Sequence, residues 1–470
     1  MYVNPDQSVR SVGPKCEGQG MARIGRRGFL LGATAVLAGC AQVDYAAPVA
    51  KGPARFDAAA PGRQAAGPWW SAFRDPTLDQ LIAAGQARNL DVLQAIAAIE
   101  EARASVAGSD AADLPQLSGT VKGTRGNTTG AGVTESRSGA LSVGWTADLF
   151  GANRAGRAAA SARLDAAYAS ADVARLVMEG AIAQAYAELR YQQASIALTR
   201  KSLESRRKSL ELTRAQVESG SAGRLELLQA EQLVAEGEAQ LPGYETAFDQ
   251  ALVTLATLTA QPVSALRPQL TKGAGQPRPR FKASVGVPAD VLRARPDVRL
   301  AERNYAAAVY DIGVAKAAFY PSVTLSGSVT PTHLRDASTI RYWAVGPALD
   351  LPIFTGGANR ANLRGAEARA VQAKLAWEKA VLTAIDEVES ALAAYNRDGR
   401  NIAAQAHLVD TSAETLELSR TNYSLGEGDF MAVLDAERSY LSAQQSRASA
   451  EWSRAADFIT LSIAAAGGIR

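Results

Sequence analysis

The stretch that decides the fold reads Leu141-Ser142-Val143-Gly144-Trp145-Thr146-Ala147-Asp148-Leu149-Phe150-Gly151-Ala152-Asn153-Arg154. Its first half alternates apolar and polar residues, which is the period of a β-strand with one apolar face. From Ala152 the pattern becomes helical and continues to Ser219 without a proline. A helix of that length, about 100 Å at 1.5 Å per residue, must lie along neighbouring helices because it cannot wrap a globular core.

The same arrangement occurs again at an offset of 206 residues. Asn153-Arg154 matches Asn359-Arg360, and each dipeptide follows an alternating run. The other matching pairs are Asp91 and Asp297, Pro115 and Pro321, Gly220 and Gly426, and Ala230 and Ala436. A repeat held in one register favours a supersecondary unit that is laid down twice, with neither copy closing a fold alone.

Each copy is predicted to contain a leading helix, a strand hairpin and a helical hairpin. The leading helices span Thr77 to about Ala112 and Ala289 to about Ala318. The alternating runs cover residues 117–124 and 141–148 in the first copy and 322–329 and 343–350 in the second, and polar loops with Gly or Pro join each pair.

The long helices are predicted to fold back at glycine-rich breaks. These breaks are Gly220-Ser221-Ala222-Gly223 and Gly426-Glu427-Gly428. Glycines followed by a new amphipathic run mark tight helix-to-helix turns. Pro242 lies inside the first returning helix, where the second copy has Ala448, and is expected to kink or interrupt that helix.

The composition excludes several functional classes. Aromatic residues make up 6% of the chain, the net charge is +3, and acids and bases are interleaved, so nucleic acid is not indicated as a partner. Two cysteines and two isolated histidines, His333 and His407, are too few for a disulfide framework or a zinc site. No phosphate-binding loop or nucleophile elbow occurs. We therefore expect neither catalysis, nor a metal, nor a cofactor other than a covalent lipid.

Residues 1–39 are predicted to form an export signal, with Met21 as an alternative start. A basic segment with Arg26-Arg27 precedes about a dozen apolar residues, too few to span a bilayer. The Arg pair also resembles a twin-arginine signal, so either export route stays open.

Leu37-Ala38-Gly39-Cys40 resembles a bacterial lipobox, in which Cys40 is acylated and becomes the mature N-terminus. The acyl chains of one such cysteine are enough for stable membrane attachment. An ordinary cleavage site with a chance cysteine is the alternative. Position 41 is Ala rather than Asp, which points to the outer membrane. Residues 40–68 form a lipidated tether, and the two repeats occupy 69–274 and 275–470.

Four strands with one apolar face need partners, because open sheet edges are not tolerated in hydrocarbon. Outer-membrane barrels begin at about eight strands, so four cannot close alone. Three chains would complete a twelve-stranded barrel under cyclic symmetry. Their six helical hairpins would continue it as a hollow cylinder about 100 Å deep.

Several motifs together resemble the TolC-like outer-membrane factors, in the OprM/NodT branch of efflux lipoproteins. They are Arg295-Pro296-Asp297-Val298, Ala318-Phe319-Tyr320-Pro321-Ser322, Leu349-Asp350-Leu351-Pro352-Ile353-Phe354 and Leu434-Asp435-Ala436-Glu437-Arg438. The resemblance covers roughly residues 68–466 and includes the internal duplication. It implies a homotrimeric channel-tunnel in the outer membrane that joins a periplasmic adaptor and an inner-membrane pump of the RND class. That pump supplies the driving force for export of drugs or other small molecules.

The resemblance also implies roles for two groups of residues. The turns with Gly220, Ser221 and Gly223, and with Gly426, Glu427 and Gly428, become periplasmic tips that contact the adaptor. Related channels close their periplasmic end with charged residues near the second tip. Glu414, Glu417 and Arg420 are candidates for such a gate; the alternative is an ordinary solvated helical face.

Two other functions compete with the channel. A lipid-anchored periplasmic adaptor carries one helical hairpin, whereas this chain repeats both its strand hairpin and its helical hairpin. A structural coiled coil has no use for the alternating strands. The duplication at 206 residues therefore favours the channel.

Overall fold

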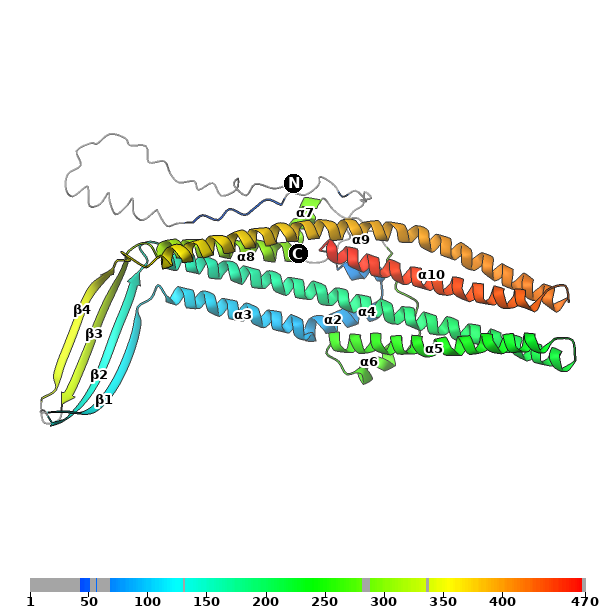
Figure 1. Cartoon of the computed structure of the whole chain (residues 1–470), viewed down its shortest axis with the longest axis horizontal. Helices are drawn as coiled ribbons and strands as arrows, with labels where there is room; N and C mark the ends of the chain where they lie inside the picture. Colours follow the sequence, from blue (N-terminus) through cyan, green and yellow to red (C-terminus); the bar gives the residue numbers. More distant parts are fainter. Residues whose placement is uncertain are drawn as a thin grey trace, which may run out of the picture.

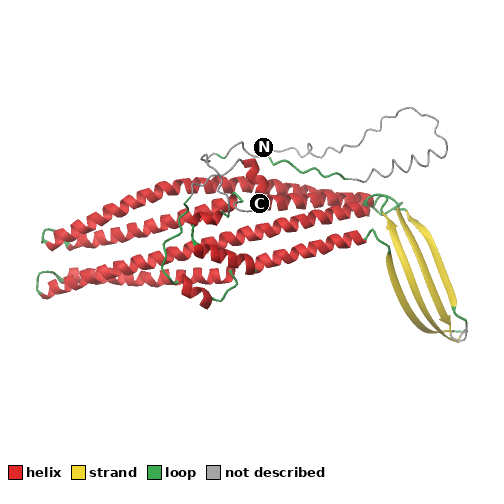
Figure 2. Cartoon of the chain, turned by 180° about the vertical axis from the view of Figure 1, so that it is seen from behind, coloured by secondary structure: helices red, strands yellow, loops and turns green. Residues whose placement is uncertain are grey.

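The computed structural model describes residues 43–50, 56, 68–129, 132–280, 288–334 and 338–466. Long helices run side by side, and a four-stranded sheet extends from one end of the bundle (Figure 1). Figure 2 shows the same division from behind, with all helices on one side of the junction and all strands on the other. The fold therefore has a sheet end, a helical body and two helical tips at the far end.

The two repeats have matching elements. The first contains α3 (Leu90–Ala111), β1 (Gln116–Thr128), β2 (Gly132–Ala147), α4 (Ala152–Glu218) and α5 (Arg224–Leu258). The second contains α8 (Pro296–Ala317), β3 (Ser322–Leu334), β4 (Ile340–Asp350), α9 (Ala358–Ser424) and α10 (Phe430–Ala464). Apart from β4, each element of the second repeat begins 206 positions after its counterpart. The predicted duplication, hairpins and long helices are confirmed.

Each predicted leading helix is divided in two. The structure has α2 (Pro76–Arg88) before α3, and α7 (Pro288–Ala294) before α8. The breaks fall at Asn89 and Arg295, which are extended and lie 206 positions apart. Arg295 precedes a proline, which disfavours helical geometry at that residue. Asn89 accepts bonds from the backbone amides of the next helix, as an N-cap does.

Asn89 and Arg295 also join two helices end to end. Asn89 Nδ2 donates to the Leu258 carbonyl at 2.9 Å, where α5 ends. Arg295 Nη1 donates to the Ala464 carbonyl at 2.9 Å, where α10 ends. The two bonds occupy equivalent places in the two repeats. Each one satisfies a carbonyl that the end of an α-helix leaves without an internal partner.

These junctions arrange the helical body as four parallel rows. Near the sheet, α3, α4, α8 and α9 pack in that order, and toward the tips the order is α5, α4, α10 and α9. α4 and α9 run the full length with 67 residues each, about 100 Å. Short helices η1 (Trp69–Phe73) and α6 (Val263–Leu270) join α2 and α7 around the middle of the body. Pro242 does not interrupt α5.

The main hydrophobic core lies at this middle level. Its largest buried side chains come from both repeats and the preceding segment: Phe56, Trp69, Phe73, Tyr186, Phe248, Tyr395 and Phe458. Phe73 meets Phe458 edge-on at 5.4 Å between ring centroids. The core therefore fixes the first helical hairpin against the second.

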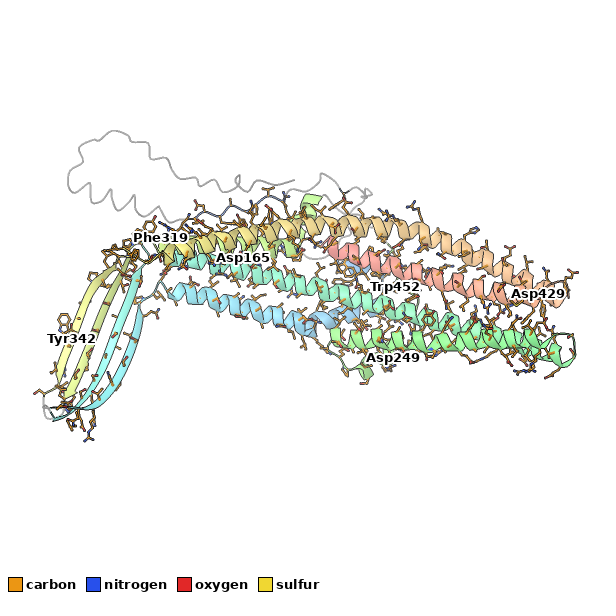
Figure 3. All side chains as sticks on the ribbon, in the orientation of Figure 1. Asp165, Asp249, Phe319, Tyr342, Asp429 and Trp452 are labelled. Atoms are coloured by element: carbon orange, nitrogen blue, oxygen red, sulfur yellow. The ribbon has the colours of Figure 1, made fainter. Side chains whose placement is uncertain are left out.

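The sheet has the order β1-β2-β3-β4 with every pair antiparallel. β1 and β4 are its outer strands and have no further partner strand among the described residues. Large apolar side chains such as Val121, Trp343 and Val345 are exposed on it. Tyr342 also projects from β4 (Figure 3). A single chain thus leaves two sheet edges and an apolar surface uncovered.

Candidate functional site

The two helical hairpins end in turns of the same geometry. Gly220 and Gly426 adopt left-handed φ values of 78° and 77°, a region that glycine enters without steric cost. The amide of Ser221 bonds to the Gln216 carbonyl at 2.8 Å, and that of Glu427 to the Asn422 carbonyl at 2.9 Å. Each of these bonds joins a backbone amide to the carbonyl five positions before it, which defines a Schellman motif at each helical tip.

The predicted tip residues all lie in these two turns. Gly220, Ser221, Gly223, Gly426 and Glu427 are exposed, while Gly428 is half-buried against Asn422. Asp429, which follows Gly428, marks the second tip in Figure 3 and caps α10 through the Met431 amide at 3.2 Å. The turns are predicted correctly, and contact with an adaptor stays a prediction.

The candidate gate residues are not brought together as a group. Glu414 and Glu417 are exposed on α9. Arg420 donates instead to Glu437 on α10, with Nη2 2.6 Å from Oε1, and also to the Ser205 hydroxyl on α4. Arg420 thus connects the second hairpin to the first, and a gating role for any of the three stays a prediction.

Sequence reasoning missed Glu437, whose side chain is only 3% exposed. Glu437 also accepts a hydrogen bond from the Ser209 hydroxyl on α4 at 3.2 Å. The signal was present in the repeat, because Arg214 and Glu231 precede Arg420 and Glu437 by 206 positions and form an ion pair of their own. The two ion pairs occupy equivalent places.

Arg206 on α4 is a second buried charge that the sequence did not reveal. Its Nη1 donates to the Leu233 carbonyl on α5 at 2.8 Å. Burial lowers the pKa of its guanidinium, and the carboxylates of Glu437 and Glu236 oppose that change. Arg438 on α10 reaches Glu236 on α5 at 3.4 Å.

We call these charged residues the tip cluster; its members are Arg206, Glu236, Arg420, Glu437 and Arg438. They come from α4, α5, α9 and α10, so the cluster spans all four rows. Buried apolar side chains including Leu233, Leu416 and Leu434 lie around it. Interactions between charges are stronger in such surroundings than in water. The cluster can therefore hold the two hairpins together near the tips.

Val43 and Tyr45 of the N-terminal segment lie along α8. The Tyr45 hydroxyl donates to Glu302, and its ring meets Tyr305 and Tyr310 at 5.8 and 6.0 Å. Val43 lies beside Gly313, nearer the sheet. Cys40 and the export signal fall outside the described residues.

No helix within the described ranges has the length and apolar character needed to cross a membrane. The same ranges contain no cluster of three or more His, Cys, Asp or Glu side chains suited to a metal ion. The His333 ring lies 3.3 Å from the Thr339 hydroxyl, between Nδ1 and Oγ1.

Comparison with known proteins places the chain in a family. Residues 81–261 and 287–467 each match the family described as outer membrane efflux protein, again 206 positions apart. The chain is 39% identical over 434 residues to nodulation protein T of Rhizobium leguminosarum bv. viciae, covering 90% of both chains.

Solved structures agree with this placement. The outer-membrane channel OprN superposes with a TM-score of 0.84 at 29% identity, covering 91% of this chain and 99% of that one. The open MtrE outer membrane channel of Neisseria gonorrhoeae gives 0.82 at 30% identity, covering 92% and 99%. With the fold, the duplication and the motifs in agreement, the chain belongs to the outer membrane efflux protein family, in its TolC-like OprM/NodT branch.

Proposed function

We propose that this chain is the outer-membrane channel of a tripartite efflux system, a passive exit duct for small molecules. The observation that carries the proposal is the pair of uncovered sheet edges above two helical hairpins of equal length. Its family consists of transport conduits rather than enzymes. The duct itself needs no catalytic step, because an inner-membrane pump supplies the driving force.

A trimer would cover the free surfaces of both the sheet and the helical body. Strands alternate in direction from β1 to β4, so β4 of one copy can pair antiparallel with β1 of the next. Three copies would then close a twelve-stranded barrel. The outer rows of the helical body also expose leucines, Leu90 and Leu93 on α3 and Leu375 and Leu382 on α9. A neighbouring copy would cover them.

Adaptor and pump partners follow from this role. The two tips lie together at the end farthest from the sheet, which is the end that a periplasmic adaptor would reach (Figure 1). The tip cluster lies just inside them and would hold the entrance closed until an adaptor binds. Exposed ion pairs are worth at most about 1 kcal/mol. The closing contacts that cross between the hairpins are the bonds from Arg420 to Ser205 and from Ser209 to the buried Glu437.

Lipid attachment at Cys40 agrees with the path of residues 43–50. Val43 lies near the end of α8 that leads into β3, and Ala50 packs against a cluster with Leu292 and Trp377 toward the middle of the body. Cys40 is three residues before Val43. An extended chain spans at most about 3.6 Å per residue, so the Cα of Cys40 would lie within about 11 Å of that of Val43.

Cell fractionation and deletion test the proposal together. The protein should run as a heat-modifiable trimer from outer-membrane fractions, and deletion of its gene should lower tolerance to drugs or dyes. Cys40→Ser should abolish labelling with a palmitate analogue while leaving the trimer measurable in detergent. A soluble periplasmic monomer would overturn the duct, whereas an unlabelled wild-type trimer would overturn only the lipid.

A further inference from the structure

A polar groove of about 370 Å³ lies midway along the helical body, between the two hairpins. Tyr191 on α4, Tyr244 on α5 and Asn401 on α9 contribute to it. The rest is one face of α10, where Gln445 lies among serines between Ser442 and Ser453. All four rows of the body therefore meet at this groove.

The groove opens away from the connector that joins α6 to α7. Arg278 of the connector pairs with Glu451 on α10 at 2.7 Å, and Gln193 on α4 donates to the Thr271 carbonyl at 3.1 Å. In the groove, Tyr191 lies two residues before Gln193 on α4, and Ser449 lies two residues before Glu451 on α10. Two residues correspond to a rotation of about 200° around a helix. The connector and the groove thus occupy opposite faces of α4 and α10. In a trimeric duct a connector inside the lumen would obstruct the passage, so the connector would lie on the outer surface. The groove, on the opposite face of the helices, would then face the lumen.

The lining of the groove has no charged side chain. In a chain with 21% charged residues, such a neutral stretch of polar wall is a distinct surface. Apart from Ala450, every lining residue carries a hydroxyl or an amide group. The Nε2 atom of Gln445 is buried and has no hydrogen-bond partner among the described residues. Burial raises the pKa of Tyr244, which keeps its hydroxyl neutral and able to donate.

An aromatic pair lies beside these polar groups. The Tyr191 ring stacks on Trp452 with centroids 5.6 Å apart and planes 27° from parallel. Trp452 lies where α10 runs beside α4 (Figure 3). Flat aromatic surface next to neutral donors and acceptors suits a solute that has both an apolar ring face and many hydroxyl groups.

Other classes of solute fit this surface poorly. A charged solute finds no opposite charge to replace its lost hydration. An apolar solute would strand the hydroxyl and amide groups, at a cost of about 1–3 kcal/mol for each buried group left unpaired. Neutral hydroxylated solutes can satisfy these groups as water does.

We propose that this groove is a transit-binding site for neutral, polyhydroxylated solutes, with a saccharide ring resting against Tyr191. Its place on the lumen wall rests on the proposed function. The binding itself can be measured without transport.

The test is a titration of purified full-length trimer in detergent with maltotriose, followed by calorimetry and tryptophan fluorescence. Wild type should bind saturably and change its fluorescence, because Trp452 lies behind Tyr191. Tyr191→Ala should weaken binding about tenfold. Gln445→Leu should weaken it too, while Trp452→Phe should remove the fluorescence change and keep the calorimetric signal.

Tyr168→Ala is the matched control, since Tyr168 is an exposed tyrosine of the same helix outside the groove. It should bind as wild type does. Each variant is first checked for heat-modifiable trimers, and Gln445→Leu serves if Tyr191→Ala fails to assemble. Absence of saturable binding by wild type, or equal loss in the Tyr168 and Tyr191 variants, would overturn the site. Binding of spermidine that depends on Tyr191 while maltotriose does not bind would overturn the assigned solute class.

Conductance in planar bilayers separates this inference from the proposed function. A trimer that conducts ions without binding maltotriose contradicts only the groove. A trimer that binds maltotriose through Tyr191 without conducting contradicts only the duct.

Discussion

In the first repeat, Arg214 and Glu231 pair across α4 and α5 at 3.3 Å, with side chains 55% and 44% exposed. In the second, Arg420 and Glu437 occupy the equivalent places on α9 and α10, pair at 2.6 Å, and leave Glu437 only 3% exposed. The backbones match, but α4 of the other hairpin covers Glu437, while Arg420 remains 42% exposed. Ion pairs at equivalent positions therefore differ in their contribution to stability, because the two repeats pack against different neighbours.

The helix junctions show a similar difference. Asn89 ties α3 to α5 with a neutral amide, whereas Arg295 ties α8 to α10 with a buried guanidinium. Arg295 also bonds to Asp297 and Glu387 at 2.7 and 2.6 Å. The end-to-end junction of two helices is thus stabilised by a neutral capping residue in the first repeat and by an ion-pair network in the second.

The largest effect is expected at this second junction. Arg295→Ala removes three hydrogen bonds of a charged donor and leaves the Ala464 carbonyl unpaired, which should lower the free energy of unfolding by about 3 kcal/mol. Asn89→Ala removes a cap and leaves the Leu258 carbonyl unpaired, which should cost about 2 kcal/mol. Urea unfolding of the trimer in detergent measures both. A larger loss from Asn89→Ala would contradict the comparison.

The next effect concerns the two ion pairs near the tips. Arg420→Ala leaves the Glu437 carboxylate buried without its cation, which should cost about 2 kcal/mol, loosen the entrance and raise single-channel conductance in planar bilayers. Arg214→Ala is the matched control and should change stability by less than about 1 kcal/mol and leave conductance unaltered. An unchanged conductance for Arg420→Ala would remove Arg420 from the gate.

Much of this architecture was predictable from sequence, because it follows from periodicity. The offset of 206, the strand hairpins and the turns at Gly220 and Gly426 all leave local signals. Burial of Glu437 leaves none, since it depends on which face of α10 meets α4. The repeat did carry a partial clue, because Arg and Glu recur at both pairs of positions.

Two other features escaped sequence reasoning for physical reasons. Composition describes residues 40–68 as a tether, yet Tyr45 holds part of that segment against α8 through tyrosines far along the chain, and Phe56 is buried in the main core. Pro242 favours a break, but packing along α4 keeps α5 continuous around it. In both cases tertiary contacts override a local preference.

A smaller effect, a dependence of folding stability on pH, is expected in the second helical hairpin but not in the first. Burial, together with a hydrogen bond to Asp457 and the charge of that residue, raises the pKa of Asp398 on α9 to about 6, while Arg454 opposes the change. The first repeat has Gln192 at the equivalent place. Because the folded chain holds this proton to a higher pH than the unfolded chain, stability should fall as pH rises from 3.8 to about 6 and then level off.

Asp398→Asn should remove that part of the pH dependence. Melting temperatures of the trimer between pH 4 and pH 7 provide the measurement. Asp410→Asn, an exposed aspartate farther along α9, is the control and should keep the wild-type profile. Identical profiles for wild type and Asp398→Asn would contradict the assignment.

The smallest effect is expected where the repeats agree. Gly220 and Gly426 share the same φ and the same Schellman bonds, so Gly220→Ala and Gly426→Ala should each cost about 1 kcal/mol, the strain of a side chain in left-handed geometry. Gly223→Ala is the control, since Gly223 has a φ of −92° that any residue adopts, and it should change stability by only a few tenths of a kcal/mol. Thermal unfolding of the trimer without an adaptor compares the three. Unequal losses at Gly220 and Gly426 would mean that the two tips, despite one backbone geometry, differ in their packing within the trimer.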